Sequence, residues 1–500
     1  MPLAVSHMGM VLGISVIVWS GLTAGFGLYL QSQCARYLEK GNASFFALSQ
    51  LTYPNASVVF DAAIAVKCFG VGVSYLIIIG DLMPAVAQGL FGSEQNVLDR
   101  HFWITAFMLI IIPLSYLRRL DSLKYTSIAA LVCIGYLVVL IVYHFAIGDT
   151  MVDRGPVRIF AWQGAVPTLS SLPVTIFAFT CHQNVCFFSA QGKNPTALKL
   201  KLIEQMFSIL NEIHDNSHFN TTSVVLASIG SAASTYILVA ITGYLSFGDN
   251  VSGNIVGMYP PGLWATIGRA AIVVLVMFSY PLQCHPCRAS VDAVLRWRPK
   301  SVSASLSGNG NSTSADTSPH RHPLLGPRGS AAEAAAGGGG GGGGETGPNR
   351  PAEPMSDLRF SLITTSILIL GYIAAMTVSS LDAVLSYVGS TGSTSISFIL
   401  PGLFYYKISS PDSPTHQRLL KEDDDEDIPD SLPAPVSDSN NTNDAEPDGS
   451  RLSFLRLRRH APSRLWRRNL LRKLSLGLVV YGGVVMVVTL TTNIMFSASH

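Results

Sequence analysis

Apolar residues in this chain are gathered into long runs, and polar links separate one run from the next. A membrane-spanning helix needs about 20 mostly apolar residues, and most of the runs approach or exceed this length. A shorter apolar segment, Met1–Gly9, precedes them. We therefore predict an all-α polytopic membrane protein with eleven segments, of which the first is partial. The full spans are expected at Val11–Leu30, Ala62–Ala87, Phe102–Leu117, Ser127–Ile147, Val166–Asn184, Val224–Phe247, Leu263–Cys284, Leu362–Ser380, Val384–Tyr406 and Leu474–Phe496.

The composition supports a membrane protein. Of the 500 residues, 48% are hydrophobic and only 13% are charged, whereas a soluble protein carries about 25% charged residues. The formal net charge is +2, and the basic residues lie mainly in the links between spans. We therefore expect the lipid bilayer as a partner and no nucleic acid, and the sequence leaves the oligomeric state open.

Basic residues are concentrated in alternate links. Arg118 and Arg119 belong to the basic set, as does the stretch Arg451–Lys473, while the opposite set holds little beyond Arg154 and two other arginines. Links rich in lysine and arginine remain on the cytosolic side of a membrane. The pattern predicts a cytosolic N-terminus and a C-terminus, His500, on the lumenal side.

Two links are long and polar. Residues 299–356 are rich in serine, glycine, proline and alanine, and residues 408–470 contain the acidic run Glu422–Asp427. Because neither holds enough apolar residues to offset the entropy lost on ordering, we predict two disordered cytosolic loops. They divide the membrane part into helices 1 (partial) to 8 in residues 1–298, helices 9 and 10 in residues 357–407, and helix 11 in residues 471–500.

The segment Leu172–Asn184 begins as an apolar helix and ends in the polar run Thr180–Asn184. Polar groups at this depth of a bilayer are costly unless they face a cavity or another helix. A helix that breaks near the membrane midplane frees backbone groups that can bind a small polar substrate. We predict such a break here, and a helix end with a polar cap is the alternative interpretation.

Several further polar residues lie within predicted spans. Lys67 is interpreted first as a side chain that snorkels to the cytosolic interface, with a coupling role as the alternative. Arg269 is expected either to snorkel or to pair with Asp249. Pro281 is expected to break its helix, which would allow Ser279 beside it to line an ion or proton site.

Enzyme motifs are missing from the sequence, which has no Walker loop, nucleophile elbow or His/Glu metal helix. Of the seven cysteines, Cys284 and Cys287 have CxxC spacing, but one such pair is weak evidence for metal or redox chemistry. We predict neither an enzyme nor a metal site. Gly389–Thr394 is interpreted as a flexible polar patch that lines a cavity within its span.

Five stretches together resemble the amino acid/auxin permease family, and most closely its fungal vacuolar amino acid transporters. They are Phe177–Asn184 (FAFTCHQN), Ser279–Arg288 (SYPLQCHPCR), Lys67–Tyr75 (KCFGVGVSY), Gly80–Pro84 (GDLMP) and Met1–Ala4 (MPLA). The resemblance runs over nearly every span. It implies a LeuT-type core of two inverted five-helix repeats, an eleventh helix, and proton- or sodium-coupled movement of amino acids.

By this resemblance, the binding site lies between the broken first and sixth helices and is completed by the third and eighth. The residues it implies for substrate binding are Pro2, Ser74, Tyr75, Ala178, Phe179, Thr180 and Cys181. Those expected to couple an ion are Lys67, His182 and Ser279. The expected coupling ion is H⁺, with Na⁺ as the alternative, and no cofactor is expected.

The chain departs from the family pattern twice. Met1 is itself the methionine of the Met-Pro motif, so half of helix one is expected to be missing, through a gene model that begins at an internal methionine or through a truncated product. The segment Val185–Gln205 interrupts a continuous family motif. We interpret it as an unspliced intron translated in frame, because its ends are compatible with GT and AG. A genuine loop insertion is the alternative.

The leading prediction is a secondary active transporter of free amino acids in an internal membrane, the vacuolar membrane, that works by alternating access. A sensor that has the same fold and binds amino acids without moving them is the alternative from a different class. A third possibility is a transporter that is inactive because helix one is incomplete. The sequence leaves open which amino acids are moved and in which direction.

Overall fold

The computed structural model describes residues 1–38, 45–91, 99–117, 124–152, 154–182, 218–296, 355–411, 413, 417 and 449–498. All regular elements in these ranges are helical, which confirms the predicted all-α class. In chain order the helices are α1 (Pro2–Met8), α2 (Met10–Ala35), α3 (Phe45–Thr52), α4 (Ser57–Phe91), α5 (Arg100–Ser115), α6 (Lys124–Ile147), α7 (Ala165–Ala178), α10 (His218–Phe247), α11 (Ile255–Met258), α12 (Leu263–Arg296), α13 (Asp357–Thr377), α14 (Leu381–Val388), α15 (Leu400–Ile408) and α17 (Gly449–Ala498).

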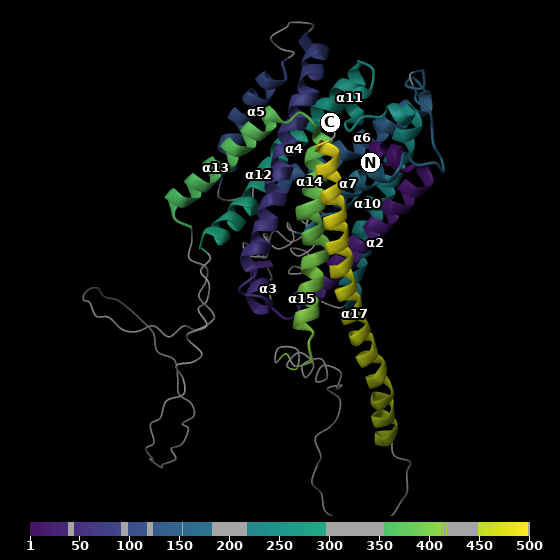
Figure 1. The fold of residues 1–500 in the computed structure, drawn as a ribbon, viewed down its shortest axis with the longest axis vertical. Coiled ribbons are helices and arrows are strands. Elements are labelled where there is room, and N and C mark those ends of the chain that lie inside the picture. Colours follow the sequence, from purple (N-terminus) through teal and green to yellow (C-terminus); the bar gives the residue numbers. More distant parts are fainter. Residues whose placement is uncertain are drawn as a thin grey trace, which may run out of the picture. The chain divides into compact units, whose positions relative to one another are not determined.

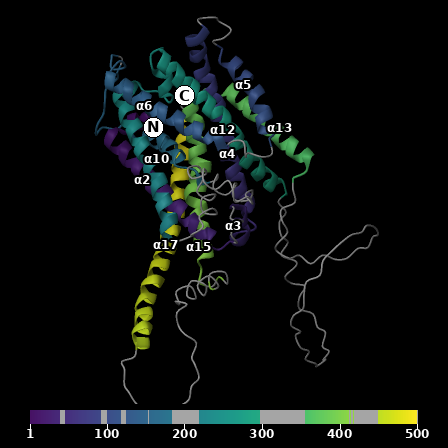
Figure 2. The ribbon, with the colours of Figure 1, turned by 180° about the vertical axis from the view of Figure 1, so that it is seen from behind.

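The helices coincide with the predicted membrane segments. Within the described ranges, eight helical segments are long and apolar enough to cross a membrane, and α5 and α7 are shorter apolar helices. Together with α1, they match the eleven segments expected from the hydrophobic pattern. Helices α2 and α10 lie side by side, as Figure 2 shows, and α15 packs along α17 (Figure 1).

Helix α12 continues through Pro281 and Pro286, so the prediction that Pro281 breaks this helix was wrong. A proline removes one backbone hydrogen bond, but neighbouring helices can compensate for this loss within a membrane protein. Here α12 packs closely along α4 (Figure 1). The packing therefore keeps both prolines inside one helix.

The last helix, α17, begins at Gly449, well before the expected start of the final span at residue 471. Residues 449–470, which were assigned to a disordered loop, are therefore helical. Leucine and arginine, both good helix formers, dominate the stretch Leu452–Arg472. Residues 299–354 of the first predicted disordered loop and residues 418–448 of the second lie outside the described residues.

Helices α1 and α2 are separated at Gly9, where φ is +80°. A Cβ added there would lie 2.6 Å from the carbonyl oxygen of Ala161, and the backbone conformation itself favours glycine. The first amide of α2, at Met10, donates to the carbonyl of Arg158 at 3.0 Å. The loop between α6 and α7 therefore caps the start of α2.

Helix α14 joins α15 through two π-helical turns, Gly389–Ser393 and Ser395–Ile399. Single π-helical turns are often found at functional sites. The small residues of the first turn are buried, and Gly389 lies against Pro173 of α7. Gly392 lies against the backbone and Cβ of Lys67 on α4. The polar patch predicted here thus provides close packing between helices.

Candidate functional site

Helix α7 ends at Ala178, at the position of the predicted break, and residues 183–217 after it lie outside the described residues. The hydroxyl of Thr180 donates to the carbonyl of Ile176 at 2.9 Å. The hydroxyl of Tyr236, on α10, donates to the carbonyl of Ala178 at 2.8 Å. Because the last carbonyls of a helix need partners when no water is present, these two hydroxyls allow α7 to stop inside the protein.

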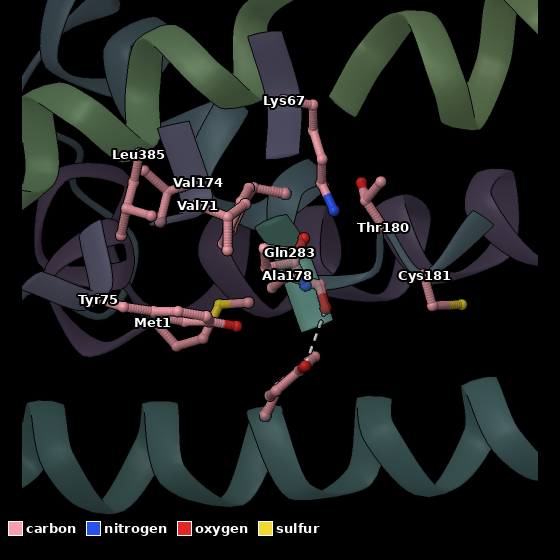
Figure 3. A pocket seen from close by; sticks show the side chains of 12 residues that line it. Met1, Lys67, Val71, Tyr75, Val174, Ala178, Thr180, Cys181, Gln283 and Leu385 are labelled. Carbon is pink, nitrogen blue, oxygen red and sulfur yellow. Dashed lines mark hydrogen bonds between the residues drawn. The ribbon is translucent and has the colours of Figure 1, made fainter. Parts of the chain in front are cut away.

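A cavity of about 410 Å³ lies beside this break (Figure 3). Its walls come from α4, α7, α10, α12 and α14, together with Met1 and the residues that follow α7. A cavity lined by both apolar and polar side chains is typical of a site for a small molecule. The polar lining residues are Lys67, Tyr75, Thr180, Cys181, Tyr236 and Gln283, and the others are Met1, Val71, Val174, Phe177, Ala178 and Leu385.

Lys67 places a cation in this cavity. Its side chain is only 3% exposed, and Figure 3 shows it directed toward Thr180. The Nζ atom lies 5.9 Å from the centroid of the Phe177 ring, and an aromatic face attracts a cation at this distance. The first interpretation of Lys67, snorkelling to the interface, was therefore wrong, because the side chain points into the protein.

Five of the predicted site residues line the cavity, and they come from two elements. They are Lys67 and Tyr75 of α4, and Ala178, Thr180 and Cys181 at the end of α7. Lys67 and Tyr75 are eight residues apart, so they lie on one face of the helix. The structure thus places residues of α4 and of the end of α7 around one cavity.

Four other predicted residues lie near the cavity without lining it. The hydroxyls of Ser74 and Ser279 donate to carbonyls of their own helices, at 2.8 Å and 2.7 Å. The ring of Phe179 is buried and packs edge-on against Tyr236, with centroids 5.1 Å apart. Pro2 is buried in α1, against Gly243 of α10. These four residues shape the surroundings of the cavity.

His182 belongs to a buried polar network directly behind the break. Its Nδ1 lies 3.3 Å from the hydroxyl of Ser397, which in turn lies 3.0 Å from the hydroxyl of Thr180. Gln31 of α2 donates to the carbonyl of His182 at 3.4 Å. His182, Ser397 and Gln31 are at most 1% exposed. The network connects the cavity residue Thr180 to α2 and to the second π-helical turn.

Some cavity residues were missed by the sequence analysis. Gln283 lies one helical turn beyond Ser279 on α12. The sequence analysis expected Ser279 to face the site, but the residue of this helix that lines the cavity is Gln283. Val71 lies four residues from both Lys67 and Tyr75, so it shares their face of the helix. This spacing could have identified Val71 from the sequence. For Tyr236 on α10 the sequence carries no such signal, because only tertiary packing brings that helix to the cavity.

The prediction that Arg269 pairs with Asp249 was wrong. Its guanidinium donates to the carbonyls of Val256 and Tyr259, at 3.2 Å and 2.5 Å, and so anchors the short helix α11. Asp249 pairs with Arg158 at 2.7 Å. Within the described part of the chain, no three His, Cys, Asp or Glu side chains are grouped in a way that suits a metal ion.

The model of the family "Transmembrane amino acid transporter protein" matches residues 1–205 and 201–423. The chain belongs to this family. The match covers α1, α7 and α12, which contain or adjoin the cavity, and it confirms the predicted family. A member of this family is a transporter and not an enzyme. The segment Val185–Gln205, interpreted above as a translated intron, lies outside the described residues.

Fungal relatives are similar over most of their length. The chain is 41% identical to vacuolar amino acid transporter 5 of Schizosaccharomyces pombe over 428 residues, which is 84% of each chain. It is 40% identical to vacuolar amino acid transporter 6 of Saccharomyces cerevisiae over 415 residues, covering 82% of this chain and 86% of the relative. Its identity to vacuolar amino acid transporter 5 of Saccharomyces cerevisiae is 38% over 436 residues, covering 84% and 87%.

Proposed function

We propose that this chain moves free amino acids across the vacuolar membrane by alternating access. The observation that carries the proposal is the cavity at the broken end of α7. An amino acid needs a partner for its carboxylate and another for its ammonium group. Lys67 supplies a cation, and the carbonyl end of α7 supplies partial negative charge. The names of the fungal relatives support both the substrate class and the membrane.

The proposed coupling ion is H⁺, with His182 as the titrating group. The ring of His182 contacts Ser397, and Ser397 contacts Thr180 at the cavity. A proton on this imidazole alters the hydrogen bonds that tie the break to α2 and to the π-helical turns, so it changes the relative stability of two helix arrangements. Lys67, which lies in the cavity itself, is the second candidate for the proton site.

Flux measurements on vacuolar vesicles that carry the full chain test this proposal. Labelled amino acids are followed with an acidic lumen and again after a protonophore has collapsed the pH gradient. We expect flux above that of vesicles without the chain, and a loss of several-fold when the gradient collapses. Binding of amino acids without any flux would support the sensor instead, and dependence on a sodium gradient would contradict H⁺ coupling.

Two histidine variants test whether His182 is the residue that couples proton movement to amino acid flux. His182→Gln keeps a polar side chain but cannot take up a proton, so its flux should no longer respond to the pH gradient. His101→Gln is the matched control, because the His101 side chain is 51% exposed at the start of α5, away from the cavity lining. An unchanged gradient response in the His182→Gln variant removes His182 from the proposal and leaves Lys67.

A further inference from the structure

The charge of the cavity is unbalanced. Among the described residues that line it, Lys67 is the one charged side chain, and none of the others is a carboxylate. None of the ion pairs between described residues includes Lys67. Its neighbours in the lining are the neutral side chains of Thr180 and Cys181 and the ring of Phe177.

Because of this uncompensated positive charge, we expect the affinity of the cavity for an amino acid to depend on the charge of its side chain. Met1 also lines the cavity, and its α-amino group interacts with the carboxyl group of Asp382. Because these two opposite charges cancel, as do the ammonium and carboxylate of any bound amino acid, the remaining charge is that of Lys67 plus that of the substrate side chain. The sum is about zero for an acidic amino acid, about +1 for a neutral one and about +2 for a basic one. Enclosing a net charge in a protein interior is costly unless an opposite charge compensates it.

The ranking does not depend on which substrate group Lys67 touches. If its ammonium binds the α-carboxylate, a basic side chain still brings a second positive charge into the same cavity. If it binds the side-chain carboxylate of an acidic substrate, the two charges cancel directly. In both poses an acidic substrate leaves the smallest uncompensated charge.

Building on the function proposed above, we propose that Lys67 makes this cavity selective for acidic amino acids and against basic ones. Two unit charges about 6 Å apart, at an effective dielectric constant of about 20, change binding by roughly 100-fold. Water that enters the open cavity weakens this effect. We therefore expect at least about a 10-fold preference for glutamate over lysine, with leucine between them.

The test compares the uptake of labelled glutamate, leucine and lysine by vesicles that carry the full chain. The wild type should rank glutamate above leucine and leucine above lysine. In Lys67→Met, the ratio of glutamate to lysine uptake should fall to within about 3-fold, because the enclosed cation is gone. Lys67→Arg keeps the charge and should keep the ranking. Lys407→Met makes the same chemical change at an exposed position at the end of α15 and should leave the ratios unchanged.

The outcomes separate this inference from the proposed function. If no amino acid moves into wild-type vesicles, the proposed function is contradicted. If lysine moves as well as glutamate, the function stands and the charge selection is overturned. If Lys67→Met lowers all three rates in proportion, Lys67 is not the selecting residue. Should that variant fail to reach the membrane, the wild-type ranking and the Lys67→Arg variant still decide the question.

Discussion

The buried basic residues Lys67 and Arg288 differ in their hydrogen-bond partners. Arg288 of α12 is 4% exposed, and its guanidinium donates to the carbonyl of Ser115 at 3.3 Å and to the hydroxyl of Thr364 at 3.0 Å. It also lies 2.9 Å from a ring nitrogen of His285. Arg288 thereby ties α12 to α5 and α13, whereas Lys67 extends into the cavity. We infer a structural role for Arg288 and a substrate-binding role for Lys67.

Replacing Arg288 by Met should destabilise the protein. The substitution removes the hydrogen bonds that Arg288 donates to a buried carbonyl and a buried hydroxyl, so we expect the free energy of unfolding to fall by about 2–4 kcal/mol. Thermal unfolding of the detergent-solubilised protein measures the loss. Arg296→Met is the control on the same helix, because the Arg296 side chain is 35% exposed and pairs with Asp292 at 2.9 Å. Such a pair is worth about 1 kcal/mol or less, so equal losses in both variants would contradict the structural role of Arg288.

At the scale of elements, the position of the second π-helical turn depends on its close approach to α2. Gly27 of α2 faces the backbone of Ser397, and a Cβ at this position would overlap with the Ser397 carbonyl oxygen. The same Cβ would lie 3.2 Å from Nε2 of His182. The hydrogen bonds from His182 to Ser397 and from Ser397 to Thr180 therefore require that residue 27 has no side chain.

Gly27→Ala should displace the π-helical turn from α2 and disturb this network. Overpacking of this kind costs about 1–3 kcal/mol, and we expect amino acid flux to fall by about 10-fold with a lower melting temperature. Gly477→Ala on α17 is the matched control, because no atom lies within 4 Å of a Cβ added there and alanine is the better helix former. Full activity and unchanged stability of the Gly27→Ala variant would show that the close approach is not needed.

At the scale of the whole molecule, the distribution of basic residues bears on orientation. Arg118, Arg119 and the arginines that follow Gly449 belong to one set of alternate links. By the positive-inside rule this set faces the cytosol. We therefore propose a cytosolic N-terminus and a lumenal C-terminus for the chain in the vacuolar membrane.

Protease protection in intact vacuoles tests this orientation. A protease added from outside should cut within residues 299–356, while an epitope placed after His500 should survive in a fragment that contains the last span. Permeabilising the membrane should then remove the epitope. A second epitope, inserted within residues 299–356, is the control for access from the cytosolic side. Loss of the C-terminal epitope from sealed vacuoles would reverse the proposed orientation.

Local sequence determined most of the helices and the break. The apolar runs located the long apolar helices of the described residues, because a bilayer requires a minimum apolar length whatever the neighbours are. The polar run after Phe179 located the end of α7, because a helix inside a membrane stops where side chains can replace its backbone partners. Conversely, Pro281 was misread, since packing against α4 decides whether a proline ends a helix.

Tertiary structure alone decided which side chains meet. From the sequence Lys67 is interpreted as an interfacial lysine, and only the folded structure shows that its ammonium lies over the ring of Phe177. Tyr236 reaches the carbonyl of Ala178 across 58 positions of the chain, and Arg269 binds the carbonyls of α11 instead of Asp249. Hydrophobic length and helix breaks are properties of a few consecutive residues, so the sequence displays them. A cavity is made by contacts between distant residues, and only the folded chain brings those together.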